Sequence, residues 1–319
     1  MLTLFIKMLP LVLMTLAGYA LNRLKWTDAA FNRQLSLVLL NVFYPALIVS
    51  SILRNFTWES LLRNWAMPAG TAFILVTGWL VGWLTLPLLR RQAESTRRCY
   101  HFVCLMNNYS FLPILMASAL WGDRAVALII FSGLGSELCV WTLGIKALTG
   151  QKLDRAFLKN LASVPMLALL GASAVLALRD TCARHGALPA SGSVTDQILT
   201  TLVETCRMIG GATIPASALI CGSRIAMLHP SKLFTPLMAG TCALRLVVIP
   251  AVCIGAITFL PVQVEVRRVL VLIAVMPAAM ASVTLAEAVG GDADFSAAAI
   301  LVTHIVCLFT IPLWLAATL

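Results

Sequence analysis

A row of polar side chains inside an apolar stretch is the feature of this sequence most suggestive of ligand binding. Asn107, Asn108, Tyr109 and Ser110 are consecutive, Pro113 follows closely, and uncharged residues flank the group on both sides. Buried amides are costly without hydrogen-bond partners, and a proline within a helix removes a backbone hydrogen bond. A helix broken here would present free N–H groups and a partial positive charge, both of which favour an anion. The alternative is that these side chains only link neighbouring helices.

Prolines in other apolar stretches mark further candidate sites. Pro277 is central in one stretch and is followed by small residues, which allow another backbone to approach closely. Pro45 and Pro215 are central in two more, and Asn41 stands about one helical turn before Pro45. We include Asn41, Pro45, Pro215 and Pro277 among the candidate substrate-binding residues, together with the group before and including Pro113. Proline is also common in membrane helices without such a role.

Ionisable residues also fall inside apolar stretches, where they are candidates for function. Glu137 and His304 are candidates to carry a coupling proton, with a core histidine bonded to a backbone carbonyl as the alternative for His304. Glu204 and Arg207 are three residues apart and share one helix face. They are either a further candidate for ion coupling or an internal ion pair that neutralises itself. Arg245 lies in an apolar stretch without an assigned role.

Catalytic and metal-binding patterns are missing from the sequence. It contains no HExxH pair, no phosphate-binding glycine loop and no GxSxG turn, so we do not expect an enzyme. The nine cysteines form no CxxC pair, and most lie in apolar stretches, where cysteine behaves as a small hydrophobic residue. We therefore expect no metal site, no disulfide framework and no cofactor.

The composition indicates what kind of structure must position these residues. Of 319 residues, 60% are hydrophobic and 11% are charged, whereas soluble chains carry about 25% charged residues. So few charges cannot cover a water-soluble core, which excludes a soluble enzyme, a disordered chain and a fibre. The stretches do not alternate as the strands of a membrane β-barrel do. An all-α polytopic membrane protein is left, because each helix satisfies its own backbone polar groups.

Ten stretches are long enough to span a bilayer, which takes about 20 apolar residues. They cover residues 3–22, 34–53, 65–89, 99–121, 125–148, 158–178, 197–222, 233–260, 268–288 and 295–317. We expect the first to be retained as a span rather than removed as a signal peptide, because it leads directly into Asn22-Arg23-Leu24-Lys25. No soluble domain fits between the spans.

The ten spans divide into two sets of five, in residues 1–148 and 149–319. Because five is odd, the second set enters the membrane from the opposite side, which is the condition for an inverted repeat. Lys and Arg are more frequent in the odd-numbered loops, which predicts that these loops are cytoplasmic and both termini periplasmic. The net charge of +10 serves this orientation and contacts with lipid headgroups, so we expect no nucleic acid partner.

Several segments resemble the auxin efflux carrier family, which includes plant auxin exporters and bacterial malonate-type permeases. They are NVFYPALIVSSIL, NNYSFLPILMAS, GGATIPASALICGSRIA and the stretch from VMPAAMASVTLAEAVGGD onward, and in order they cover essentially the whole chain. The resemblance implies ten spans in two inverted repeats, with helices 4 and 9 broken at Pro113 and Pro277 and crossing at the substrate site. It also implies a role for Asn107 or Asn108 there, and it is compatible with a homodimer.

The sequence therefore predicts a secondary transporter that moves small organic anions across the inner membrane by alternating access. The short segment 146–159 lacks the long insert of many plant auxin carriers, which favours a mono- or dicarboxylate such as malonate over auxin. The coupling ion is expected to be a proton or sodium. A membrane-embedded sensor or accessory subunit that binds a carboxylate without transport is the alternative, and a channel is disfavoured because no continuous polar stripe is present.

Overall fold

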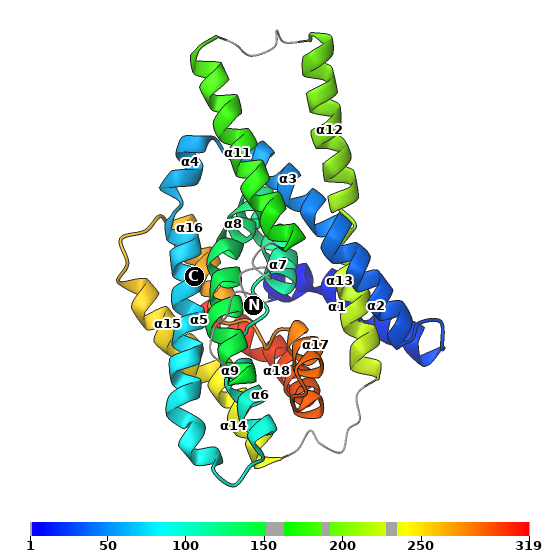
Figure 1. The fold of residues 1–319 in the computed structure, drawn as a ribbon, viewed down its shortest axis with the longest axis vertical. Coiled ribbons are helices and arrows are strands. Elements are labelled where there is room, and N and C mark those ends of the chain that lie inside the picture. Colours follow the sequence, from blue (N-terminus) through cyan, green and yellow to red (C-terminus); the bar gives the residue numbers. More distant parts are fainter. Residues whose placement is uncertain (1, 151–162, 187–191, 228–234, 319) are drawn as a thin grey trace.

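The computed structural model describes residues 2–150, 163–186, 192–227 and 235–318, and these residues are predominantly helical (Figure 1). Within the described ranges there is no β-strand, and the one pairing of extended backbone is an isolated antiparallel bridge between Asn107 and Ala278. The all-α class predicted from the composition is confirmed.

The helices are short and numerous because several of the predicted spans are bent or interrupted. The first half of the chain forms α1 (Leu2–Arg23), α2 (Ala29–Val38), η1 (Leu39–Phe43), α3 (Tyr44–Asn55), α4 (Trp58–Arg63), α5 (Ala66–Thr85), η2 (Leu86–Leu89), α6 (Glu94–Leu105), α7 (Phe111–Trp121), α8 (Asp123–Cys139), η3 (Val140–Gly144) and α9 (Ile145–Thr149). The second half forms α11 (Val164–Arg184), α12 (Val194–Gly210), α13 (Thr213–Ala226), α14 (Pro236–Ala243), η5 (Leu244–Val248), α15 (Ile249–Thr258), α16 (Val264–Ala274), α17 (Ala281–Ala288) and α18 (Ala293–Thr318).

Seven helical runs in the described part of the chain are long and apolar enough to cross a membrane, which indicates a multi-pass membrane protein. They are Ala29–Asn55, Trp58–Leu89, Asp123–Thr149, Val164–Arg184, Val194–Ala226, Pro236–Thr258 and Ala293–Thr318. Of the other predicted spans, the first coincides with α1. The fourth and the ninth each divide into two short helices, α6 with α7 and α16 with α17. Ten spans in two inverted repeats therefore stay a prediction.

Local sequence signals set where several helices begin and end. Asp28 accepts a hydrogen bond from the Phe31 N–H at 2.7 Å and caps α2, and the Thr235 hydroxyl caps α14 by accepting from the Met238 N–H at 3.1 Å. Such side chains satisfy N–H groups that the first turn of a helix leaves free. Gly122, with a φ of 78°, separates α7 from α8 in a conformation that favours glycine.

The helices pack in two groups. The first group contains α1 to α3 and α11 to α13, whereas the second contains α5 to α9 and α14 to α18. The groups meet where α3 and α11 pack on α8 and where α1 and α13 contact α7. In Figure 1, α11 and α12 of the first group extend beyond the other helices at the upper end of the molecule.

Glycine allows the closest helix crossings within and around these groups. A Cβ atom on Gly222 of α13 would lie 1.8 Å from the Thr15 carbonyl oxygen of α1, and one on Gly78 of α5 would lie 2.3 Å from the Cys104 carbonyl oxygen of α6. Small residues serve such close backbone approach in membrane helices. The absence of a side chain at Gly78 therefore lets α5 approach the Cys104 carbonyl oxygen at the end of α6.

Candidate functional site at the crossing of two interrupted helices

Two helix interruptions lie against each other and form the candidate site. Residues 106–110 separate α6 from α7, and residues 275–280 separate α16 from α17. The Asn108 N–H donates to the Pro277 carbonyl oxygen at 2.8 Å, and the Ala279 N–H donates to the Met106 carbonyl oxygen at 3.0 Å. The two extended segments thus satisfy each other's backbone groups within the protein interior, which is where such non-helical backbone is tolerated.

Proline explains how the crossing is held together. Pro277 has no N–H, so it cannot donate to the Ile273 carbonyl four residues earlier as a helical residue would. The Asn107 Nδ2 donates to that carbonyl oxygen instead, at 2.6 Å. Asn107 therefore replaces, from the other interrupted helix, a hydrogen bond that the proline prevents.

Polar atoms without protein partners occur at the same place. Asn107 and Ser282 are both fully buried, and within the described residues neither the Asn107 Oδ1 nor the Ser282 Oγ has a hydrogen-bond partner. The Asn108 Oδ1 lies 3.4 Å from the Leu112 N–H and caps the first turn of α7 loosely. Buried polar atoms are rarely left without a partner, so these atoms mark a position where a polar ligand would be stabilised.

A second polar group adjoins the start of α7. The Tyr109 hydroxyl donates to Glu137 Oε1 at 3.0 Å, and the Trp141 Nε1 donates to Glu137 Oε2 at 2.8 Å. The carboxyl group of Glu137 thus has a donor on each oxygen and is joined to the crossing through Tyr109. Glu137 is therefore an ionisable residue that is separated from the candidate site by a single side chain, that of Tyr109.

The first group of helices contributes Tyr44 to this region. The Tyr44 hydroxyl donates to the Ser110 Oγ at 3.4 Å, and its ring packs edge-on against Phe111 with centroids 5.5 Å apart. Tyr44 is buried and lies in α3, whereas Ser110 directly precedes α7 and Phe111 is its first residue. The candidate site is therefore at a boundary between the two groups of helices.

Some residues that the sequence suggested are not brought to the crossing. Asn41 is exposed in η1, where its Nδ2 donates to the Leu37 carbonyl oxygen at 2.8 Å. Pro45 is the second residue of α3, which follows the π-helical η1 without a break, and Pro215 is exposed near the start of α13. Pro113 is buried in the first turn of α7, as a proline at a helix start can be.

His304 occupies a structural position. Its Nδ1 lies 2.8 Å from the Ile300 carbonyl oxygen, one turn earlier in α18, and its Nε2 is buried without a partner among the described residues. This geometry matches the alternative stated for this residue, a core histidine bonded to a carbonyl.

The charged pair Glu204 and Arg207 is formed but is not inside the helix bundle. The Arg207 Nε lies 2.8 Å from both carboxylate oxygens of Glu204, and Arg54 approaches the same carboxylate at 3.6 Å. The side chains of Glu204 and Arg207 are 46% and 51% exposed. Glu204 and Arg207 therefore form the self-neutralising pair given above as one alternative, and the pair lies on the outside of the helix bundle. Both side chains are exposed because α12 is little covered by other helices, and Gly210 is its one buried residue.

Arg245, Tyr44 and Ser282 are residues of the site that the sequence did not assign. Arg245 stands out in the sequence as a charge in an apolar stretch, and it is the single charge between residues 233 and 264; an isolated charge of this kind needs a partner, but the sequence does not show which one. Nothing in the local sequence distinguishes Tyr44 or Ser282 from other residues of membrane helices.

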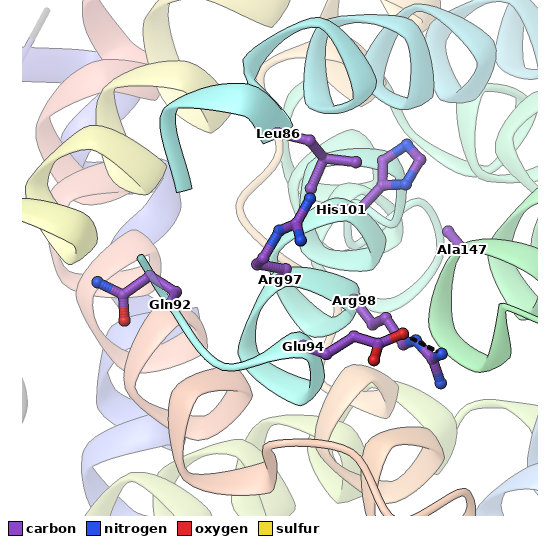
Figure 2. Close-up of a pocket in the computed structure, with 7 residues that line it drawn as sticks. All are labelled: Leu86, Gln92, Glu94, Arg97, Arg98, His101 and Ala147. Carbon is purple, nitrogen blue, oxygen red and sulfur yellow. Dashed lines mark hydrogen bonds and ion pairs between the residues drawn. The ribbon is translucent and has the colours of Figure 1, made fainter. Parts of the chain in front are cut away.

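A pocket of about 320 Å³ lies beside the first turns of α6 (Figure 2). It is lined by Leu86, Gln92, Glu94, Arg97, Arg98, His101 and Ala147. Arg98 pairs with Glu94 and donates to the Thr149 carbonyl oxygen at 2.9 Å, while the Arg97 Nε is buried without a partner in the described structure. With two arginines and one glutamate, the pocket carries an excess of positive charge. Across the described residues, no cluster of His, Cys, Asp and Glu is arranged to hold a metal ion.

Comparison with known proteins adds a family relationship. The family described as membrane transport protein matches residues 3–180 and 187–315. The chain is similar to Protein PIN-LIKES 5 of Arabidopsis thaliana, with 21% identity over 374 aligned residues that cover 96% of this chain and 94% of that protein. It is also similar to Protein PIN-LIKES 1 of the same plant, with 23% identity over 116 residues that cover 36% of this chain and 24% of that protein.

Proposed function

The chain belongs to the membrane transport protein family, and from this membership we propose that it is a secondary carrier for small organic anions such as mono- or dicarboxylates. It would act in the inner membrane by alternating access, with ten spans in two inverted repeats and with both termini periplasmic. A homodimer is compatible with this proposal.

The observation that carries the proposal is the crossing of the two interrupted helices. Helix α7 begins shortly after the buried Asn107 and Asn108, and the buried Ser282 is the second residue of α17. Helix starts carry a partial positive charge and free N–H groups, and interrupted helices near the membrane centre form the substrate sites of many secondary transporters. A carboxylate bound here would accept from these groups, and the Asn107 Oδ1 would interact with a hydroxyl or protonated carboxyl of the same substrate.

The two groups of helices offer the two parts that alternating access needs. Tyr44 of the first group touches Ser110 and Phe111 of the second. If the second group moved against the first, this contact would break and re-form, and the candidate site would change its access. The positive pocket beside Arg97 and Arg98 would attract anions toward the second group from one side of the membrane.

Glu137 is the best-placed group to couple a proton to transport. Its carboxyl is joined to the start of α7 through the Tyr109 hydroxyl. An ionised Glu137 would repel a substrate carboxylate, and protonation of Glu137 would remove this repulsion. Substrate and proton would then bind together, so that a proton gradient drives accumulation of the anion.

Transport by purified protein tests the proposal. Proteoliposomes would be assayed for uptake of radiolabelled malonate, succinate, pyruvate and lactate, with a proton gradient, a sodium gradient and a membrane potential imposed separately. We expect saturable uptake of at least one of these carboxylates and stimulation by an inward proton gradient. Binding of a carboxylate without uptake would favour a sensor or accessory subunit, whereas uptake that never saturates would indicate a channel.

The orientation of the spans can be tested independently. Single cysteines at Gln92 and Gly186 in a variant without native cysteines should react with a membrane-impermeant maleimide from opposite sides of the membrane. Reaction of both from the same side would exclude the arrangement of five spans followed by five inverted spans.

A further inference from the structure

Arg245 is the largest fully buried side chain of the described structure. It lies in the π-helical segment η5, ahead of Pro250 in α15. Such π-helical segments are frequent at functional sites, and a charged side chain in this environment is costly unless its charge and its donors are satisfied.

The guanidinium group of Arg245 binds the ends of both interrupted helices. Its Nη1 donates to the Cys104 carbonyl oxygen at 2.9 Å, one residue before the end of α6. Its Nη2 donates to the carbonyl oxygen of Ala274, the last residue of α16, at 3.3 Å, and its Nε donates to that of Met276 at 3.2 Å. A single side chain thus connects α6 and α16 at their carboxyl-terminal ends.

The partners of Arg245 are dipoles rather than an acid. Among the described residues, none of the ion pairs includes Arg245. The carboxyl-terminal end of a helix carries about half a negative charge, so the ends of α6 and α16 together carry about one. The positive charge of the guanidinium therefore neutralises the partial negative charges at the ends of α6 and α16.

The starts of α7 and α17, on the other side of the two interruptions, keep their partial positive charges when the ends of α6 and α16 are neutralised. Helices α7 and α17 have no acidic residue in their first turns, and each start carries about half a positive charge. Asn107 and Ser282, which offer unpartnered buried atoms, stand at the same crossing. Glu137 is the acid joined to this region, through Tyr109, and its protonation would leave about one positive charge unbalanced.

We propose that Arg245 is the resident cation of the crossing, which neutralises the ends of α6 and α16 so that the starts of α7 and α17 accept one carboxylate group without an inorganic cation. The part of this statement that concerns the substrate rests on the proposed carrier function. Arg245 acts as a positioning residue, because it contacts the helix ends and not the substrate.

Chemical rescue tests the charge of Arg245 without any substrate. Purified Arg245→Ala protein should melt about 5–10 °C below the wild type, because three buried carbonyl groups lose their donor. Methylguanidinium in the millimolar range should restore at least half of this loss, whereas neutral methylurea and sodium chloride should not. The wild type should melt at the same temperature in sodium and in N-methylglucamine buffers. Equal rescue by methylurea, an unshifted Arg245→Ala variant or a sodium requirement of the wild type would overturn the proposal.

Variants that retain size cover the case in which Arg245→Ala does not fold. In uptake of malonate, or of the carboxylate of the panel that is transported, Arg245→Lys should raise KM by less than about threefold and Arg245→Gln by about tenfold or more. A purely structural role would lower the amount of active protein equally and leave KM unchanged, and that result would also overturn the proposal. Rescue by methylguanidinium without uptake of any carboxylate would instead retain the resident cation and refute the carrier function.

Discussion

Replacing Asn107 by alanine removes the hydrogen bond that compensates for Pro277. The Asn107 Nδ2 and the Ile273 carbonyl oxygen are 2.6 Å apart, and Asn107 is fully buried. Pro277 cannot supply the usual helical N–H to this carbonyl, so the longer bond from the Met276 N–H, at 3.3 Å, would remain. Losing one buried hydrogen bond of this kind costs about 0.5–1.5 kcal/mol, so the crossing should lose this amount of stability.

Asn41 provides a matched control within the same chain. Its amide also donates to a backbone carbonyl, that of Leu37 at 2.8 Å, but it is exposed in η1. Asn41→Ala should therefore change the free energy of unfolding by no more than about 0.5 kcal/mol. Thermal unfolding of the detergent-solubilised proteins would compare the two variants, with a shift of about 2–3 °C expected per kcal/mol in a chain of this size.

The same pair of variants separates stability from substrate binding. Loss of the Asn107 Oδ1 should raise the KM for a transported carboxylate by about 10- to 100-fold, and Asn107→Asp should be worse because its charge would repel the anion. Asn41→Ala should transport normally. An Asn107→Ala variant with wild-type melting temperature and wild-type KM would refute both the hydrogen-bond argument and the placement of the substrate.

Three further changes test other parts of the structure. Glu137→Gln should retain exchange of internal for external substrate but lose the roughly tenfold accumulation that one unit of pH gradient can drive through one proton, as measured by uptake with and without the gradient. Glu204→Gln should alter the melting temperature by less than about 2 °C, because the side chain is about half exposed. A large fall in the amount of protein in the membrane would instead indicate that the ion pair is buried. Gly78→Ala should reduce folded protein strongly, because its Cβ would lie 2.3 Å from the Cys104 carbonyl oxygen, whereas Gly171→Ala in α11 meets nothing within 4 Å and should be tolerated in the same expression assay.

The features that the sequence predicted best are those encoded locally. An amide pair followed by Pro113, and small residues after Pro277, indicated where helices would be interrupted, because proline acts on the backbone within one turn. The crossing itself is implied by the family resemblance, and the structure pairs Asn107 with Ala278 across it. The spacing of Glu204 and Arg207 likewise predicted that the two side chains would meet, which they do.

Burial and long-range partners could not be predicted in the same way. The spacing of Glu204 and Arg207 fixes their contact but not the exposure of α12, which depends on the helices packed around it. Arg245 is 141 residues from Cys104 in the sequence, and Tyr44 is 66 residues from Ser110. No periodicity within a single helix indicates such pairs, since they arise only when separate interrupted helices are brought together.

Counterflow in proteoliposomes tests the central claim most directly. Vesicles containing the purified protein and loaded with an excess of unlabelled malonate, or of the carboxylate transported in the panel, would be diluted into a trace of the same labelled compound. A carrier with one site that faces each side in turn predicts a transient accumulation of label above equilibrium, and Asn107→Ala should diminish it at low substrate. Label that only rises to equilibrium, or does not exceed that in protein-free vesicles for any carboxylate, would contradict transport of organic anions by alternating access at this crossing.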